Sequence, residues 1–362
     1  MPKRLPFSRE LDTPCLVIDL DALEANIRSM QSFFSDKTAR LRPHFKTHKC
    51  LPIAHKQIAA GAKGITAAKV SEAEVLAWGG IKDVLIANQI VGEAKIRRLV
   101  GLARHTSVTV AVDSADNARE LAAAARAAGA TLGVLVEVDI GMGRCGVKPG
   151  RDAVELARIV NSQRGLAFRG LQGYEGHLVL REPGAEKDRL TVEAIRLLAR
   201  TKRAIENEGL CCEEISGGGT GTYRVAASEG VMTEIQAGSY ATMDARYAKV
   251  TPEFAKALFV LVTIISRPKK GLAIGDAGLK SITSEFGMGE VEGVKGAAVD
   301  RLSEEHTLIR VKGEAEKLAV GDRILVTPSH GCTTINLYDK ACGVRKGYVE
   351  CSWRIDGRGK SQ

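Results

Sequence analysis

The chain has 362 residues, of which 44% are hydrophobic, 26% charged and 4% aromatic. These proportions are those of a globular protein with an aliphatic core, and they exclude a disordered chain. The formal net charge is +9. Because the Lys and Arg residues are scattered along the chain and form no basic arm, we expect no nucleic-acid partner.

The eight cysteines indicate a reducing compartment, since they form no CxxC pair and lack the density of a secreted disulfide scaffold. No segment reaches the roughly 18 apolar residues that a membrane span needs. The N-terminal sequence MPKRLPFSRE also lacks the apolar stretch of a signal peptide. We therefore expect a cytoplasmic protein that has no membrane partner.

From Cys15 to about Tyr240, short β-branched runs alternate with amphipathic stretches at a spacing typical of βα units. The predicted strands begin at Cys15, Leu41, Ile65, Asp83, Ser107, Leu132, Ala167, Glu213 and Glu234. Gly129 and Gly209 are expected to end two of the intervening helices. Eight or nine such units favour a (β/α)8 TIM-type barrel over an open doubly wound sheet, and the first βα turn lacks G-x-G-x-x-G.

After about Lys249 the helical periodicity fades, and the strand-like segments FVLVTIISRP, LAIGDAGL, HTLIRVKG and DRILVTPSHG follow one another. This pattern predicts a second, β-rich domain. We expect the α/β barrel to cover residues 13–248. The β-rich domain would cover residues 249–362, together with residues 1–12.

The segment RPHFKTHK carries the first candidate site. If it is a strand, Arg42, His44, Lys46 and His48 project to one face. Crowded cationic groups lower the pKa of a lysine, and a neutral amine can condense with an aldehyde. A solvated edge strand is the alternative interpretation.

Two glycine-rich segments, SGGGTGTY and AGSY, follow consecutive predicted strands late in the barrel. Backbone amides near Gly218, Gly219 and Gly238 can approach a phosphate, and hydroxyl donors stand beside them at Thr220, Ser239 and Tyr240. Each segment alone is also compatible with a tight turn. Together they occupy a common phosphate position of barrel enzymes.

Further polar side chains follow the sixth and seventh predicted strands. Arg144 in DIGMGRCGV is a candidate donor to an anionic ring oxygen, and Gln172, Tyr174 and His177 follow in LQGYEGH. A lone histidine is more often structural, but these residues share the C-terminal strand ends where barrel enzymes carry their sites.

In PSHGC, His330 and Cys332 stand two residues apart after a predicted strand. If the strand continues, both side chains point to one side and can share a metal ion, for which imidazole and thiolate favour zinc. A buried cysteine beside a turn histidine is the structural alternative. An open coordination sphere would suit a catalytic metal.

In their order along the chain, the motifs resemble the family of D-threonine aldolases and eukaryotic-type D-serine dehydratases. The motifs are LDTPCLVIDLDALEANI, RPHFKTHK, DIGMGRCGV, GLQGYEGH, SGGGTGTY, QAGSYATMD, DAGLK and PSHGCTTINLYD. The resemblance spans about residues 11 to 358. The stretch around Gln172 and Tyr174 resembles the aldolase branch, whereas His330-Gly331-Cys332 is the pattern of the dehydratases in place of the His-x-Asp of aldolases.

The resemblance implies an alanine-racemase-like barrel of pyridoxal-phosphate (PLP) fold type III joined to a C-terminal β-domain. It implies a cofactor bound covalently to Lys46, with Arg144 near its phenolic oxygen. The phosphate would be held by Thr220, Gly238, Ser239 and Tyr240. It also implies a divalent metal (zinc, manganese or magnesium) on His330 and Cys332, and a homodimer.

The resemblance favours a lyase that acts on 3-hydroxy D-amino acids. In retro-aldol cleavage the substrate hydroxyl binds the metal, His177 is the candidate base, and glycine and an aldehyde are formed. In the alternative dehydratase reaction, Lys46 removes the Cα proton, and a keto acid and ammonia are formed. Two other functions are less favoured. An amino-acid racemase would need no metal, so the pair His330 and Cys332 argues against it. A non-catalytic PLP carrier would resemble the barrel alone, so the second domain argues against it. The roles of Asp276, Lys280 and His306 stay open.

Overall fold

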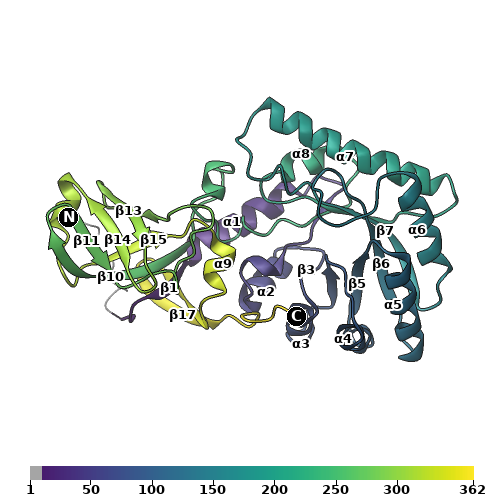
Figure 1. The fold of residues 1–362 in the computed structure, drawn as a ribbon, viewed down its shortest axis with the longest axis horizontal. Helices are drawn as coiled ribbons and strands as arrows, with labels where there is room; N and C mark the ends of the chain where they lie inside the picture. Colours follow the sequence, from purple (N-terminus) through teal and green to yellow (C-terminus); the bar gives the residue numbers. More distant parts are fainter. Residues whose placement is uncertain (1–9) are drawn as a thin grey trace. The chain divides into compact units, whose positions relative to one another are not determined.

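The computed structural model describes residues 10–362. The signal-peptide prediction and most of the predicted N-terminal part of the β-rich domain fall on residues 1–9, which lie outside the described residues. The chain forms two compact units (Figure 1). The barrel unit comprises residues 30–46, 53–238 and 360–362, and the β-rich unit comprises the described residues up to 29, 47–52 and 239–359. The predicted division between residues 248 and 249 stays a prediction.

The barrel unit contains eight parallel strands in the order β2, β9, β8, β7, β6, β5, β4 and β3. An isolated bridge between His44 and Thr66 joins the two edges of this sheet, so the sheet curls into a barrel. This arrangement confirms the predicted barrel. The strands are β2 (Arg40–Leu41), β3 (Ile65–Ala67), β4 (Asp83–Ile86), β5 (Ser107–Val112), β6 (Leu132–Glu137), β7 (Leu166–Gly173), β8 (Glu214–Gly217) and β9 (Glu234–Ile235).

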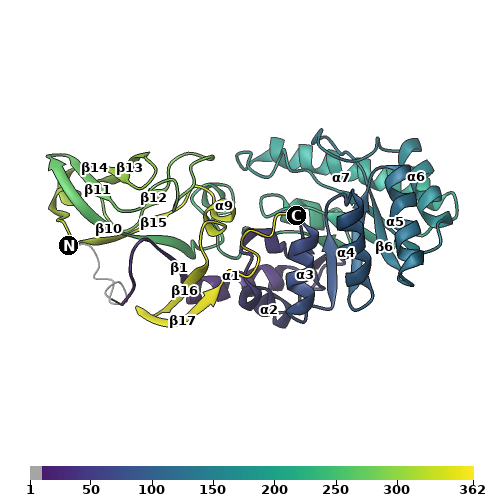
Figure 2. The ribbon, with the colours of Figure 1, turned by 60° about the horizontal axis from the view of Figure 1, so that its bottom comes forward.

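The barrel strands are apolar on both faces because parallel strands are covered by helices. Val110 of β5 is level with Val134 of β6, and both side chains are fully buried. Helices surround the strands (Figure 2), and the successive helices after the first of them pack against one another. They are α2 (Leu51–Ala59), α3 (Val70–Trp78), α4 (Glu93–Ala103), α5 (Ala115–Ala127), α6 (Arg151–Ser162), α7 (Ala185–Glu206) and α8 (Tyr223–Ser228), and α1 (Leu20–Phe33) runs across the division between the units.

The helix ends follow local signals in the sequence. The hydroxyl of Ser114 accepts the amide of Asn117 and so caps the start of α5. Gly129 and Gly209 follow the ends of α5 and α7 with φ angles of 62° and 78°, which confirms both as helix terminators. Among residues 10–362, every helix is too short or too polar to cross a bilayer.

The β-rich unit contains a nine-stranded mixed sheet whose longest strand, β10, pairs with β1, β11 and β15. Its buried Val260, Val262 and Ile264 alternate along β10 and form one apolar face. The strands are β1 (Cys15–Asp19), β10 (Leu258–Lys269), β11 (Leu272–Gly275), β12 (Glu290–Val291), β13 (Ala297–Leu302), β14 (Thr307–Val311), β15 (Arg323–Thr327), β16 (Lys340–Arg345) and β17 (Tyr348–Arg354). The turns η3 (Tyr247–Lys249) and η4 (Gly313–Lys317) and the short helix α9 (Gly331–Ile335) complete the unit.

Strand β1 differs from its predicted place. The sequence groups CLVID with the barrel strands, but Ile18 pairs with Leu258 of β10 and with Gly343 of β16. Removing β1 from the nine predicted strands leaves the eight that form the barrel. A buried apolar strand carries no local signal for the sheet it joins, which explains the difference.

Candidate active site

Lys46 does not lie on a β-strand. Strand β2 ends at Leu41, and Phe45–Thr47 form a single 3-10 turn. Lys46 is exposed within a segment whose neighbouring side chains are buried. The prediction that four cationic side chains share one face of a strand is therefore wrong, because the regular alternation that it required is absent.

Arg42 instead belongs to a buried ion-pair network at the other end of the barrel strands. Its guanidinium donates to Glu234 at 2.9 Å and to Asp83 at 2.8 Å, the first residues of β9 and β4. The ammonium of Lys63 bonds to Glu234 at 2.9 Å and to Glu214 at 3.2 Å. These opposite charges satisfy one another at the N-terminal strand ends, where barrels carry stabilising residues.

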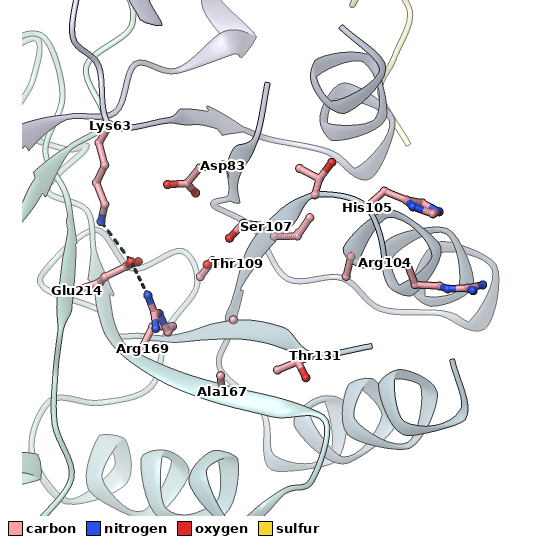
Figure 3. A pocket seen from close by; sticks show the side chains of 14 residues that line it. Lys63, Asp83, Arg104, His105, Ser107, Thr109, Thr131, Ala167, Arg169 and Glu214 are labelled. Carbon is pink, nitrogen blue, oxygen red and sulfur yellow. Dashed lines mark hydrogen bonds and ion pairs between the residues drawn. The ribbon is translucent and has the colours of Figure 1, made fainter. Parts of the chain in front are cut away.

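A polar cavity of about 560 Å³ lies beside this network (Figure 3). Lys63, Asp83, Arg169 and Glu214 line it together with Ser107, the first residue of β5. Glu214 is bonded to both Lys63 and Arg169 (Figure 3). We interpret this cavity as the solvated base of the barrel, since its central charges are already paired and none of the predicted site residues lines it.

The C-terminal strand ends bring three predicted segments together. The amide of His44, two residues before Lys46, donates to the carbonyl of Ala237 at 3.2 Å. The amide of Gln236 donates to the carbonyl of Gly217 at 2.8 Å. Because β2, β9 and β8 are consecutive in the sheet, the lysine segment lies next to the AGSY segment, which lies next to the SGGGT segment.

The SGGGT segment needs glycine because its backbone packs closely against neighbouring side chains. Gly218 has a φ angle of 72°, a conformation that favours glycine. A Cβ at Gly218 would meet Ile235 at 2.9 Å, and one at Gly219 would meet Val179 at 3.0 Å. Thr220, which follows, is buried. Amides in such a loop can bind phosphate oxygens.

Glu175 stabilises the SGGGT segment, a role that the sequence does not predict. Its Oε1 accepts the hydroxyl of Thr222 at 2.6 Å, and the same threonine oxygen accepts the amide of Gly219 at 3.2 Å. The side chain is fully buried, and its Oε2 has no hydrogen-bond partner among the described residues. Burial raises the pKa of Glu175. A buried carboxyl group leaves no signal in the sequence that separates it from a surface glutamate.

Gln172 belongs to a chain of polar side chains near the C-terminal ends of β6 to β9. Its Oε1 accepts Nε2 of Gln236 at 3.1 Å, and Nε2 of Gln236 also donates to Ser216 at 2.7 Å. Gln89 donates to Glu137, the last residue of β6. Burial raises the pKa of Glu137, although hydrogen bonds from Gln89 and the charge of Arg144 oppose the rise.

Arg144 lies close to Tyr174, and His177 lies against the loop that carries Arg144. The Arg144 guanidinium carbon lies 5.7 Å from the Tyr174 ring centroid. The backbone of Gly141 lies against the ring of His177. Burial alone would raise the pKa of Asp139, but amide hydrogen bonds from Gly143 and its neighbours, together with the charge of His177, lower it.

The AGSY segment crosses the division between the units. Gly238 ends the main segment of the barrel unit, and Ser239 begins the main segment of the β-rich unit. Ser239 and Tyr240 are buried, and the Tyr240 ring lies 5.8 Å from the ring of Phe254. The carbonyl of Ser239 accepts the amide of Met243 at 2.8 Å.

His330 and Cys332 contact each other, but not through a continuing strand. β15 ends at Thr327 and α9 begins at Gly331, so Cys332 lies on a short helix. Burial alone would lower the pKa of His330, but hydrogen bonds to Cys332 and Glu285 raise it to about 9. The described residues contain no group of three or more His, Cys, Asp or Glu that would hold a metal ion. The imidazole of His330 and the thiol of Cys332 are a donor pair that fits a metal ion of intermediate softness such as zinc. Two ligands leave the other coordination positions of such an ion open.

The three residues left open by the sequence have structural contacts. Asp276 accepts the Thr13 hydroxyl at 2.5 Å and the Thr263 amide at 2.9 Å. Lys280 forms exposed ion pairs with Glu304 and Glu305. The carbonyl of His306 accepts the amide of Ser303 in the turn between β13 and β14.

Two family models match the chain. "Alanine racemase, N-terminal domain" matches residues 18–246, and "Putative serine dehydratase domain" matches residues 257–344. The barrel and the mixed second sheet agree with this pair of matches. They define the class of the protein as an alanine-racemase-like enzyme of the PLP-dependent type.

Comparison with whole proteins narrows this class. A D-threonine aldolase from Arthrobacter sp. is 42% identical, with 99% of this chain and 95% of that protein covered. A 3-hydroxy-D-aspartate aldolase from Paracoccus denitrificans is 39% identical, with 97% and 93% covered. The crystal structure of D-threonine aldolase from Filomicrobium marinum has a TM-score of 0.95 and 41% identity, with 98% of this chain and 97% of that chain covered. The chain belongs to the D-threonine aldolase family of lyases.

Proposed function

We propose that this protein is a PLP- and metal-dependent lyase that cleaves 3-hydroxy D-amino acids to glycine and an aldehyde. The two aldolase relatives, similar over nearly the whole chain, support retro-aldol cleavage. The observation that carries the proposal is the order β2, β9, β8, which supports a shared site for Lys46 and both glycine segments. These three features are what a phosphorylated aldehyde cofactor requires.

Lys46 would hold the cofactor through Nζ, and the amides of Gly218, Gly219 and Gly238 would bind its phosphate. Hydroxyl groups would add further donors to the phosphate, from Thr220, Ser239 and Tyr240. When bound, the cofactor supplies a ring that accepts electrons from the bond being broken. Arg144 would donate to its phenolic oxygen, and Gln172 and Tyr174 would orient the ring.

His330 and Cys332 would bind the metal, which supplies a Lewis acid for the substrate hydroxyl. A solved structure of the related D-threo-3-hydroxyaspartate dehydratase, 28% identical with a TM-score of 0.87, is described as the metal-free form of a cysteine-to-alanine variant. That description supports a metal role for a cysteine in the family. Zinc, manganese and magnesium are the candidate ions.

His177 is the proposed base, which would take the proton of the 3-hydroxyl group on a ring nitrogen. The carboxylate of Asp139 interacts with His177 and would balance the positive charge that the imidazole gains. The exposed position of His177 after β7 supports access to a substrate at the C-terminal strand ends.

Dehydration is the second candidate, because a specific observation favours it. His330-Gly331-Cys332 is the metal pattern we associate with the dehydratases, and a D-threo-3-hydroxyaspartate dehydratase from Delftia sp. is 32% identical, with 90% of this chain and 92% of that protein covered. In that reaction the Nζ of Lys46 would remove the proton from the Cα of the substrate.

Product analysis separates the two reactions. The holoenzyme is incubated with D-threonine, D-phenylserine, D-serine and D-3-hydroxyaspartate. Glycine and the matching aldehyde support the aldolase, whereas ammonia and a keto acid establish the dehydratase. We also propose a homodimer, which sedimentation equilibrium of the holoenzyme would test.

A further inference from the structure

The imidazole of His330 is held by its neighbours on an edge and on a face. Its Nδ1 lies 2.6 Å from Oε1 of Glu285. The ring of Phe286 stacks on it with centroids 4.3 Å apart and an interplanar angle of 20°. Rotation about the Cα–Cβ bond of His330 would break both contacts, and a flip of the ring about Cβ–Cγ would break the contact with Glu285, so the ring has one favoured orientation.

Glu285 is itself fixed by the segment that carries His330. The hydroxyl of Thr333 donates to Oε1 of Glu285. The hydroxyl of Thr283 lies 2.7 Å from that of Thr333 and 3.0 Å from that of Thr334. The hydroxyl of Ser329 donates to the carbonyl of Thr283 at 3.3 Å. Residues 283–285 and 329–334 thus form one hydrogen-bonded cluster.

The contact with Glu285 decides which nitrogen of His330 is available. A carboxylate accepts a hydrogen bond, so Nδ1 carries a proton in this contact and Nε2 is the ring nitrogen left to bind a metal ion. A metal-binding histidine commonly donates its other N–H to a carboxylate in this way, which fixes the ring and strengthens the metal-binding nitrogen. Glu285 does not form a three-ligand group with His330 and Cys332 among the described residues.

We propose that Glu285 is a positioning residue that orients His330 and presents its Nε2 to the metal ion. This inference rests on the proposed function, since it assumes that His330 binds a metal. Glu285 touches neither substrate nor cofactor in this account and acts only through the imidazole. Its side chain is 39% exposed and that of His330 is 17% exposed, so the carboxylate is the more solvent-exposed member of the pair.

The experiment measures metal affinity directly. Glu285→Gln and Glu285→Ala are prepared as full-length holoenzymes, treated with a chelator, and titrated with Zn²⁺ against a chromogenic chelator. Both changes should weaken Zn²⁺ binding about 10- to 100-fold, and Ala should do so more than Gln because the amide oxygen still accepts the Nδ1–H bond. The matched control is Glu350→Gln, which removes a half-exposed carboxylate of β17 that is bonded to Arg345 of β16, and it should leave Zn²⁺ affinity unchanged.

A Co²⁺ absorption spectrum of each variant provides a second readout. A changed spectrum in the Glu285 variants, with the Glu350 variant like the parent, supports an altered ligand orientation. Parental Zn²⁺ affinity in both Glu285 variants would overturn the inference. If the parent and His330→Ala bind Zn²⁺ equally, the proposed metal site itself fails, and this result is distinct from the first.

Discussion

The amide of His44 donates to the carbonyl of Ala237, and this bond ties the segment of Lys46 to the strand end that leads to Gly238. The next strand in the sheet, β8, leads to Gly218 and Gly219. A cofactor that carries an aldehyde and a phosphate needs both kinds of group within the length of one small molecule. The order of the strands in the barrel therefore brings the lysine segment next to the glycine segments.

Replacing Gly218 by alanine should weaken PLP binding roughly tenfold or more, a loss of about 1.4 kcal/mol. The added methyl group would enter a loop at φ 72° and press on Ile235. The measurement is a PLP titration of the apoenzyme followed by absorbance. Gly230→Ala is the matched control, because Gly230 has φ 68° and a Cβ added there would have no neighbouring atom within 4 Å. Equal affinity in the two variants would contradict a phosphate role for the loop.

Replacing Glu175 by glutamine should stabilise the protein increasingly as the pH rises. Burial raises the folded-state pKa of Glu175 above its ordinary value of 4.5. The native protein therefore holds this proton more tightly, and its stability falls as the pH rises from the ordinary value through the raised one. Glutamine does not titrate and can still accept the Thr222 hydroxyl. Urea midpoints of both proteins between about pH 5 and pH 8 test this, and a constant difference would show that Glu175 is ionised throughout.

Replacing Arg42 by methionine should lower the free energy of unfolding by about 3 kcal/mol, because the buried Glu234 would keep only Lys63 as an oppositely charged partner. The absorbance of bound PLP in the folded variant should stay unchanged, since Arg42 lies at the opposite strand ends. Arg189→Met is the control, because Arg189 pairs with Glu186 and Glu193 on the exposed face of α7 and should matter little. A shifted cofactor spectrum in Arg42→Met would mean that Arg42 reaches the cofactor after all.

Removing the metal should abolish turnover of D-threonine while the cofactor stays bound. Chelation would empty the proposed site on His330 and Cys332, and adding back Zn²⁺, Mn²⁺ or Mg²⁺ should restore activity. The readouts are the rate of glycine release and the PLP absorbance of the same sample. Full activity in the presence of chelator would exclude a catalytic metal.

The sequence predicts the barrel well because its strands are short, apolar and separated by helices with clear ends. Gly129 and Gly209 end their helices as expected, and the segments of β10, β11, β14 and β15 are strands. The sheet that β1 joins could not be predicted, since pairing with β10 depends on residues some 240 positions away.

The candidate site was predicted less completely than the fold. The sequence predicts that Lys46 and Arg42 share one face of a strand. In the structure Lys46 lies on a 3-10 turn, whereas Arg42 forms an ion pair with Glu234 at the other end of the barrel. The sequence does not predict the roles of Glu175 and Glu285, because these roles come from burial and from contacts with distant segments. Motif spacing identifies residues that follow strands, whereas the groups that support them appear only after folding.

The most direct test of the account identifies the lysine that carries the cofactor. The holoenzyme is reduced with borohydride, digested, and searched by mass spectrometry for a phosphopyridoxyl-lysine. The account predicts this mass on Lys46, and a Lys46→Ala variant should show no label at all. A label on another lysine of the parent protein would contradict the account.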